Sequence, residues 1–200
     1  MNHQTDNYSI RVHPYQVIIF LMLAGLSALF LALTAAYLYQ RVEMGIEPIR
    51  LPIIFLFNSL ILIGCSYFIK QANFAYLEDN TDKYIRSLYI TTGLTLVFMI
   101  AQYIGWQIMN NNGIFLTDGP ATSYLYLLSG LHLVHVFGGL PALLWFIYTA
   151  VKYMKEPVTV LVYFSDPDRR LKLKLLTTYW HFLDILWIYL VVFFMVMSLF

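Results

Sequence analysis

Five apolar segments, each long enough or nearly long enough to cross a lipid bilayer, constrain this chain more than any other feature of its sequence. They cover approximately residues 14–39, 53–70, 87–109, 123–153 and 171–200. A helix needs about 20 apolar residues to cross a hydrocarbon core of roughly 30 Å, so the second segment is slightly short. Apolar runs of this length without two-residue alternation exclude barrel strands. The sequence therefore predicts an all-α integral membrane bundle of five transmembrane helices.

The scarcity of charged residues supports a membrane protein. Only 12% of the 200 residues are charged, against about 25% in soluble domains. The net charge of +1 offers no surface for nucleic acid, and the single cysteine, Cys65, provides neither a disulfide nor a thiolate metal site. The polar tail, residues 1–13, does not resemble a signal peptide. Residues 14–200 are expected to form one membrane domain.

Basic residues are distributed unevenly between the two faces of the predicted bundle. One face would receive ten lysines and arginines, and the other only Arg41 and Arg50. The positive-inside rule then places the N-terminus in the cytoplasm and the C-terminus outside. The connection over residues 154–171 contains the apolar stretch "VTVLVYF", which is too short to span a membrane. It is expected to lie at the membrane interface or against a partner.

Ionisable residues inside the predicted spans fall into two motifs. His132 and His135 lie one turn apart in "SGLHLVHVFGG", and His181 and Asp184 lie one turn apart in "YWHFLDILW". An acid in the bilayer costs about 2.5–3.5 kcal/mol, so Asp184 needs a partner. In neighbouring antiparallel helices, residues at equal height keep a constant sum of residue numbers, and this pairs His132 with Asp184 and His135 with His181. The sequence predicts one four-residue polar cluster.

Three interpretations of this cluster remain open. It can be structural, with hydrogen bonds that fix two helices against each other. It can be a proton relay, because His and Asp are common intramembrane proton carriers. It can also hold a cofactor, with His135 and His181 as axial haem ligands or the whole cluster as a metal site. A di-iron bundle needs several inward glutamates, so the structural interpretation is favoured, with no catalytic or metal-binding residue.

Further polar and aromatic residues are predicted to make helix-packing or lipid contacts. In the second and third spans these are side chains able to hydrogen-bond between helices, and in the last two spans they are aromatic or basic. The residues are Tyr179, Trp180, Trp187, Asn58, Gln102 and Lys152.

The two histidine motifs resemble subunit III of the haem–copper cytochrome oxidases. Family members commonly read Thr-Gly-x-His-x-x-His-Val-x-x-Gly and then Tyr-Trp-His-Phe-Val-Asp-x-x-Trp. Here Ser129 replaces the threonine and Leu183 the valine. Weaker similarity covers "LPIIFLFNSLILIGCS" and "AQYIGW", so the resemblance spans approximately residues 14–199. The five-span pattern resembles short bacterial members, which lack the first helix pair of longer ones.

The resemblance implies an accessory, non-redox subunit of a bacterial respiratory terminal oxidase in the inner (plasma) membrane. Such a complex reduces oxygen to water with electrons from cytochrome c. Haems and copper would lie in subunits I and II, and this chain would pack on subunit I, within a larger supercomplex where one forms. It would bind phospholipid and support assembly, stability and proton uptake. Two glutamates common in the family are absent, since residues 23–28 are apolar or small and Gly105 follows "AQYI".

Other functions remain compatible with the motifs. Quinol oxidases and nitric-oxide reductases have similar accessory subunits, so the electron donor and acceptor stay open. A stand-alone haem-binding electron carrier or a proton-coupled transporter would use the same histidines. A haem band in the optical spectrum of the chain alone would distinguish these from an accessory subunit.

Overall fold

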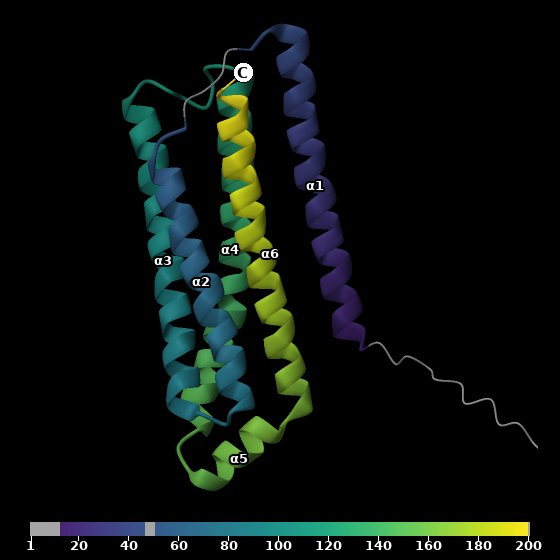
Figure 1. Cartoon of the computed structure of the whole chain (residues 1–200), viewed down its shortest axis with the longest axis vertical. Helices are drawn as coiled ribbons and strands as arrows, with labels where there is room; N and C mark the ends of the chain where they lie inside the picture. The colour runs from purple at the N-terminus through teal and green to yellow at the C-terminus, as the bar shows by residue number, and fades with distance from the viewer. Residues whose placement is uncertain (1–12, 47–50, 200) are drawn as a thin grey trace, which may run out of the picture.

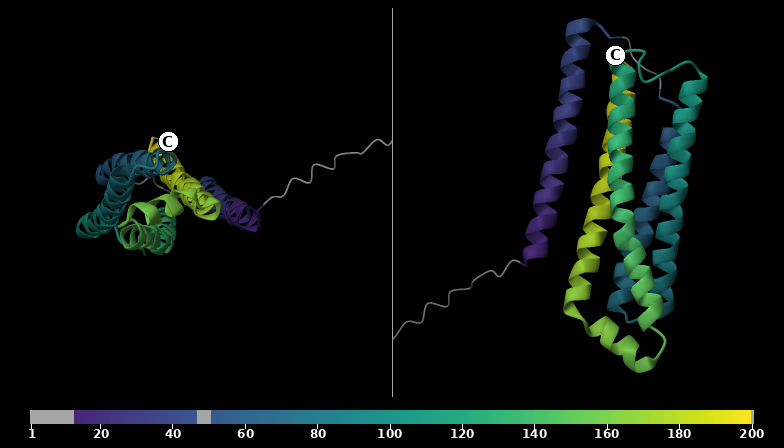
Figure 2. Two further views of the ribbon diagram at one scale, coloured as in Figure 1. Left: turned by 90° about the horizontal axis from the view of Figure 1, so that it is seen from below. Right: turned by 180° about the vertical axis from the view of Figure 1, so that it is seen from behind.

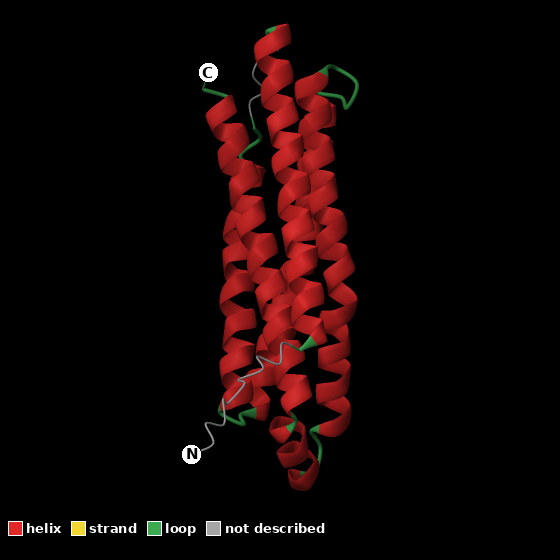
Figure 3. Ribbon diagram, turned by 90° about the vertical axis from the view of Figure 1, so that its right-hand side faces the viewer, coloured by secondary structure: helices red, strands yellow, loops and turns green. Residues whose placement is uncertain are grey.

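The computed structural model describes residues 13–46 and 51–199, and in these ranges the chain forms helices without strands (Figure 1 and Figure 3). Five helices are long and apolar enough to cross a membrane, as predicted: α1 (Pro14–Met44), α2 (Ile54–Leu77), α3 (Thr81–Asn111), α4 (Pro120–Tyr153) and α6 (Pro167–Met197). The short helix α5 (Pro157–Ser165) connects α4 to α6. Nearly all of the predicted tail, together with Arg11 and Arg50 of the orientation argument and the last residue of the fifth span, lies outside the described residues.

Helix ends follow local capping chemistry. Asp166 caps α6, because its carboxylate accepts from the backbone N–H groups of Asp168 and Arg169. Proline occupies the first turn of α1, α4, α5 and α6, where its missing N–H costs nothing. Gly45 ends α1 with a φ of 61°, a left-handed conformation that glycine adopts without steric cost.

Four of the long helices form a closed ring. The most extensive packing joins α2 to α3, and α6 packs on both α2 and α4, while α3 completes the ring against α4. Helix α1 stands to one side, against α4 and α6 (Figure 2). It is the least buried of the spans and exposes large apolar side chains over most of its length.

Aromatic rings and hydrogen bonds hold α1 in place. Tyr37 of α1 is buried among the rings of Tyr124, Phe193 and Phe194, with centroid distances of 5.6–5.8 Å. The Thr34 and Tyr189 hydroxyls lie 2.7 Å apart. Arg41 donates to the backbone carbonyl of Met197, which satisfies one of the free carbonyls at the end of α6.

The stretch "VTVLVYF" forms most of α5 and lies across one end of the bundle. Its two buried residues, Tyr163 and Phe164, pack on Tyr76 of α2 and Tyr84 of α3 with centroid distances of 5.1–6.2 Å. The Tyr76 hydroxyl donates to the carbonyl of Tyr163 at 2.8 Å. The guanidinium of Arg169 lies 3.8 Å from the centre of the Tyr163 ring. These apolar residues therefore have a partner within the chain itself.

Candidate functional site: the polar core around α6

The two histidine motifs face each other on α4 and α6. His132 is fully buried, and its Nε2 lies 3.0 Å from the backbone carbonyl oxygen of Leu183. One turn away, the Tyr179 hydroxyl donates to the backbone carbonyl of His135 at 2.8 Å. A Cβ atom on Gly139 would lie only 2.7 Å from Cε1 of Tyr179 and 2.8 Å from Cζ3 of Trp180. Only glycine allows this approach, so the motifs lock α4 and α6 in one register.

His181 and Asp184 face a different helix. The hydroxyl of Ser66 on α2 donates to Oδ2 of Asp184 at 2.5 Å. The Ser66 hydroxyl oxygen also lies 2.7 Å from Nδ1 of His181. Because a serine hydroxyl has one proton, His181 Nδ1–H is the donor in the second bond. The result is a chain from His181 through Ser66 to Asp184 that joins α2 to α6.

The four predicted residues therefore do not form one cluster, and this corrects the pairing of histidine with aspartate across α4 and α6. His132 bonds to a backbone carbonyl, and Nδ1 of His135 lies 2.6 Å from the Leu131 carbonyl of its own helix. The predicted heights were nearly right, since His132 meets the residue next to Asp184. The direction around the helix was wrong, because successive residues are turned by about 100° and Asp184 points to α2.

The same geometry bears on the haem interpretation. The His135 ring lies edge-on to Phe30 of α1 with a centroid distance of 6.3 Å, whereas His181 bonds to Ser66 of α2. The two imidazoles thus face different neighbours rather than opposite sides of one iron. Among the described residues, no three His, Cys, Asp or Glu side chains converge as a metal site would require.

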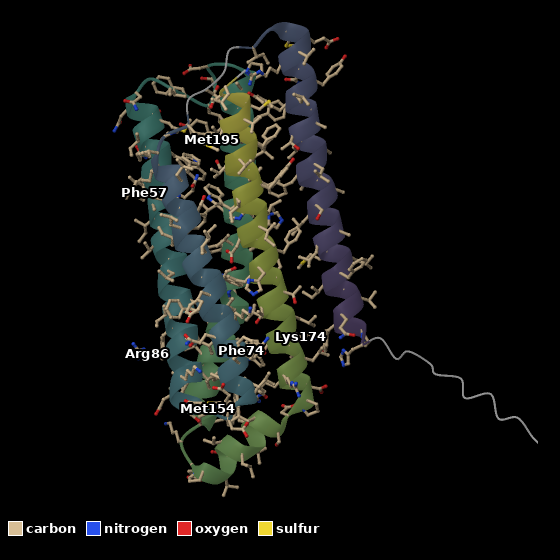
Figure 4. All side chains as sticks on the ribbon, viewed as in Figure 1. Phe57, Phe74, Arg86, Met154, Lys174 and Met195 are labelled. Carbon is tan, nitrogen blue, oxygen red and sulfur yellow. The ribbon has the colours of Figure 1, made fainter. Side chains whose placement is uncertain are left out.

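His181 also connects the polar chain to the outside of the bundle. It lines a groove of about 580 Å³ between α2 and α6, together with Lys70, Arg170 and Lys174. Phe74 and Lys174 line the same groove from the two helices (Figure 4). Asp184, by contrast, is 3% exposed. A buried carboxyl is therefore linked by two hydrogen bonds to an imidazole at the edge of a basic groove.

The remaining predicted residues fall into three environments. The Asn58 amide donates to Oε1 of Gln102 at 2.9 Å, which joins α2 to α3 in the core. Tyr179, Trp180 and Trp187 are all buried, so they pack inside the bundle. Lys152 lies on the surface at the end of α4, with Nζ 5.4–5.6 Å from the ring centres of Tyr148 and Tyr153.

Comparison with known proteins identifies the bundle. The family model described as cytochrome c oxidase subunit III matches residues 16–199. The chain belongs to this family. Its histidine motifs on α4 and α6 lie within the matched region, and so does Ser66, which sequence reasoning missed. No sequence signal separates Ser66 from the many membrane serines that bond to their own backbone, such as Ser59, which donates to Phe55.

Curated relatives support the family. The proteins named "Cytochrome c oxidase subunit 3" from Lachancea kluyveri and Candida glabrata are 26% and 28% identical over 150 residues, 75% of this chain and 50% of each relative. The protein of the same name from Hippopotamus amphibius is 24% identical over 148 residues, 74% of this chain and 52% of the relative. The chain thus spans about half the length of the curated relatives it matches.

Proposed function

We propose that this chain is an accessory, non-redox subunit of a respiratory terminal oxidase that reduces oxygen to water. The observation that carries the proposal is that residues of both family motifs contact other helices of the same chain. His132, Tyr179 and Gly139 fix α4 on α6, and His181 and Asp184 fix α6 on α2. Side chains committed to neighbouring helices of their own chain support a structural role for the motifs. The chain would contribute assembly and stability, while haems and copper belong to partner subunits.

The partners in this proposal are oxidase subunit I, by direct packing, and subunit II, within a respiratory chain complex. The long apolar surface supports an intramembrane partner. Helix α1 in particular exposes Phe20, Leu21 and Val42 by 63–81% of their surface. Contiguous exposed apolar surface on a membrane helix must be covered by lipid or by another protein.

Phospholipid is the small-molecule ligand of the proposal. A groove of about 440 Å³ runs between α1, α4 and α6, with an almost entirely apolar lining that includes Ile18, Met22 and Trp145. Lys172 lies at this groove, its Nζ 5.5 Å from the centre of the Tyr15 ring. An apolar furrow with one lysine matches an acyl chain that ends in a phosphate headgroup.

Support of proton uptake forms part of the same proposal. The carboxyl group nearest the middle of a span is Asp184, and its link to the basic groove through Ser66 and His181 offers a route for a proton. We propose cytochrome c as the electron donor, which the names of the relatives support, and a bacterial plasma membrane as the location, which the resemblance to five-span members supports.

Copurification tests the subunit assignment. A tagged copy of the full chain, expressed in its native host, is expected to bring down a haem-bearing complex that oxidises cytochrome c. The same chain expressed alone should show no haem band. A stoichiometric haem band on the isolated chain that disappears in His135→Ala would contradict the proposal and favour a haem-binding carrier.

Cysteine labelling tests the proposed orientation, with the N-terminus in the cytoplasm. The native Cys65 is buried, so new cysteines can be read against a low background. Asn112→Cys lies in the α3–α4 loop and Glu156→Cys in the α4–α5 turn, both exposed. A membrane-impermeant maleimide added outside the cells should label only Asn112→Cys. Labelling of Glu156→Cys alone would show the opposite orientation, with the N-terminus outside.

A further inference from the structure

Four buried polar atoms in the bundle core have no hydrogen-bond partner among the described residues. They are Oδ1 of Asn58, Nε2 of Gln102, Nδ1 of His132 and Nε1 of Trp187. Each belongs to a different helix of the ring, and each side chain is at most 1% exposed. Buried polar groups in native proteins are almost always paired, with protein or with ordered water. Four such atoms therefore need an explanation.

The four residues occupy one layer of the core. The Asn58–Gln102 hydrogen bond joins α2 to α3, and the ring centroids of His132 and Trp187 lie 5.0 Å apart across α4 and α6. Trp187 also stacks at 5.8 Å on Phe55, which lies one turn from Asn58.

A second aromatic ring connects the two pairs. Phe98 lies one turn from Gln102 on α3. Its ring meets Trp187 at 5.2 Å and His132 at 5.7 Å. Phe55 and Phe98 thus lie one turn from Asn58 and Gln102 along their own helices, and both rings also contact the Trp187 indole. The Asn58–Gln102 pair and the His132–Trp187 pair therefore lie at the same depth in the bundle.

The unpaired atoms are chemically complementary. His132 Nε2 faces a carbonyl oxygen, which only accepts, so Nδ1 of the neutral ring is an acceptor. The Trp187 indole N–H is a donor only. The amides of Asn58 and Gln102 share one bond, which leaves one oxygen and one NH₂ group free. If both amides are turned by 180°, one oxygen and one NH₂ group are again left without a partner. The layer thus offers two donors and two acceptors.

We propose that one internal water molecule binds in this layer and joins all four ring helices. It accepts from Trp187 and Gln102 and donates to Asn58 and His132, which uses both hydrogens and both lone pairs of a water molecule. Buried waters typically make about three hydrogen bonds to otherwise unsatisfied groups. This site is independent of the proposed oxidase function.

A density map of the chain in its native complex, at a resolution that shows ordered water, tests the proposal directly. The expected result is an isolated peak at about 2.7–3.2 Å from at least three of the four atoms. A layer without such a peak, or a direct hydrogen bond from Trp187 Nε1 to His132 Nδ1 that leaves no room for it, would overturn the proposal.

Nuclear magnetic resonance of the full chain, reconstituted in lipid nanodiscs with ¹⁵N-tryptophan, provides a second measurement. Trp187→Phe keeps the ring position and identifies the Trp187 indole signal by its loss. In the unchanged chain, this N–H proton should show a cross-peak to a long-lived bound water. Absence of the cross-peak on a well-resolved indole signal would refute the bound water.

Two substitutions on α3 form a matched pair for the same readout. Gln102→Leu removes one donor to the water and is expected to weaken the cross-peak at least twofold. Thr91 lies three turns from Gln102 on the same helix, and its buried hydroxyl donates only to the backbone carbonyl of Ser87 at 2.9 Å. Thr91→Val removes this hydroxyl and should leave the cross-peak unchanged. Equal effects of both substitutions would count against a specific site, while the map of the unsubstituted complex remains decisive if Gln102→Leu fails to fold.

Discussion

Replacement of Gly139 by alanine is the sharpest perturbation of the contact between α4 and α6. The added Cβ would lie 2.7–2.8 Å from carbons of Tyr179 and Trp180, whereas carbon atoms in ordinary contact are about 3.5–4.0 Å apart. Neither ring can withdraw easily. The Tyr179 hydroxyl is held by the carbonyl of His135 at 2.8 Å, and Trp180 is 2% exposed. Either the helices separate or the rings leave their positions.

The neighbouring glycine provides the control needed to estimate the magnitude. A Cβ on Gly138 would meet nothing within 4 Å. Both substitutions gain the same helix propensity, about 1 kcal/mol, so the difference between them isolates the steric clash. Overpacking a well-packed core typically costs about 1–3 kcal/mol. We therefore expect Gly139→Ala to be about 1–3 kcal/mol less stable than Gly138→Ala, and Gly138→Ala to be at least as stable as the unchanged chain.

The assay is reversible unfolding of the full chain in mixed detergent micelles, followed by circular dichroism, with retention in the proposed oxidase complex as a second readout. Gly139→Ala combined with Trp180→Phe should recover part of the loss, because phenylalanine lacks the outer carbons of the indole. If Gly138→Ala and Gly139→Ala unfold at the same denaturant concentration, the close approach does not exist in the folded protein and the proposed lock is wrong.

Two further matched pairs probe the remaining contacts. Ser66→Ala should cost about 0.6–2 kcal/mol by breaking the link between His181 and Asp184, while Ser59→Ala, which loses only a bond within its own helix, should change the unfolding free energy by less than about 0.5 kcal/mol. A larger effect of Ser59→Ala would contradict the assigned role of Ser66. Arg169→Lys removes the planar group stacked on Tyr163 and should increase protease cleavage near α5 several-fold, whereas Arg170→Lys should not; equal cleavage of the two would show that the stacking does not hold α5.

The positions of the spans follow from the sequence because lipid imposes a minimum apolar length. The helix ends do not, because they depend on contacts beyond the hydrocarbon. The second span was expected to end near residue 70, yet α2 continues to Leu77. Its last turns bury Ala72, Ala75 and Tyr76 against α3 and α5. The start of α3 was predictable in principle, since Asn80 caps it by accepting from the backbone N–H of Lys83.

The polar core was only half predictable for a geometric reason. Residue numbers along antiparallel helices give relative height, and this brought His132 to within one residue of its true neighbour on α6. They do not give the direction around the helix axis, which depends on which helices surround α6. Short connections predict that consecutive spans are neighbours, and they give no information on spans further apart in the chain. The contact of α6 with α2, three spans earlier, could not be inferred from connection length.

That contact makes α6 the organising helix of the bundle. One face, through His181 and Asp184, bonds to Ser66 of α2. A second face, through the Leu183 carbonyl, meets α4, and a third, through Tyr189, meets α1. Because α6 follows the other spans in the chain, these three contacts can form only after it has entered the membrane. A substitution on one face of α6 should therefore loosen chiefly the helix that this face meets, whereas loss of α6 from the membrane should weaken the association of α1, α2 and α4 together.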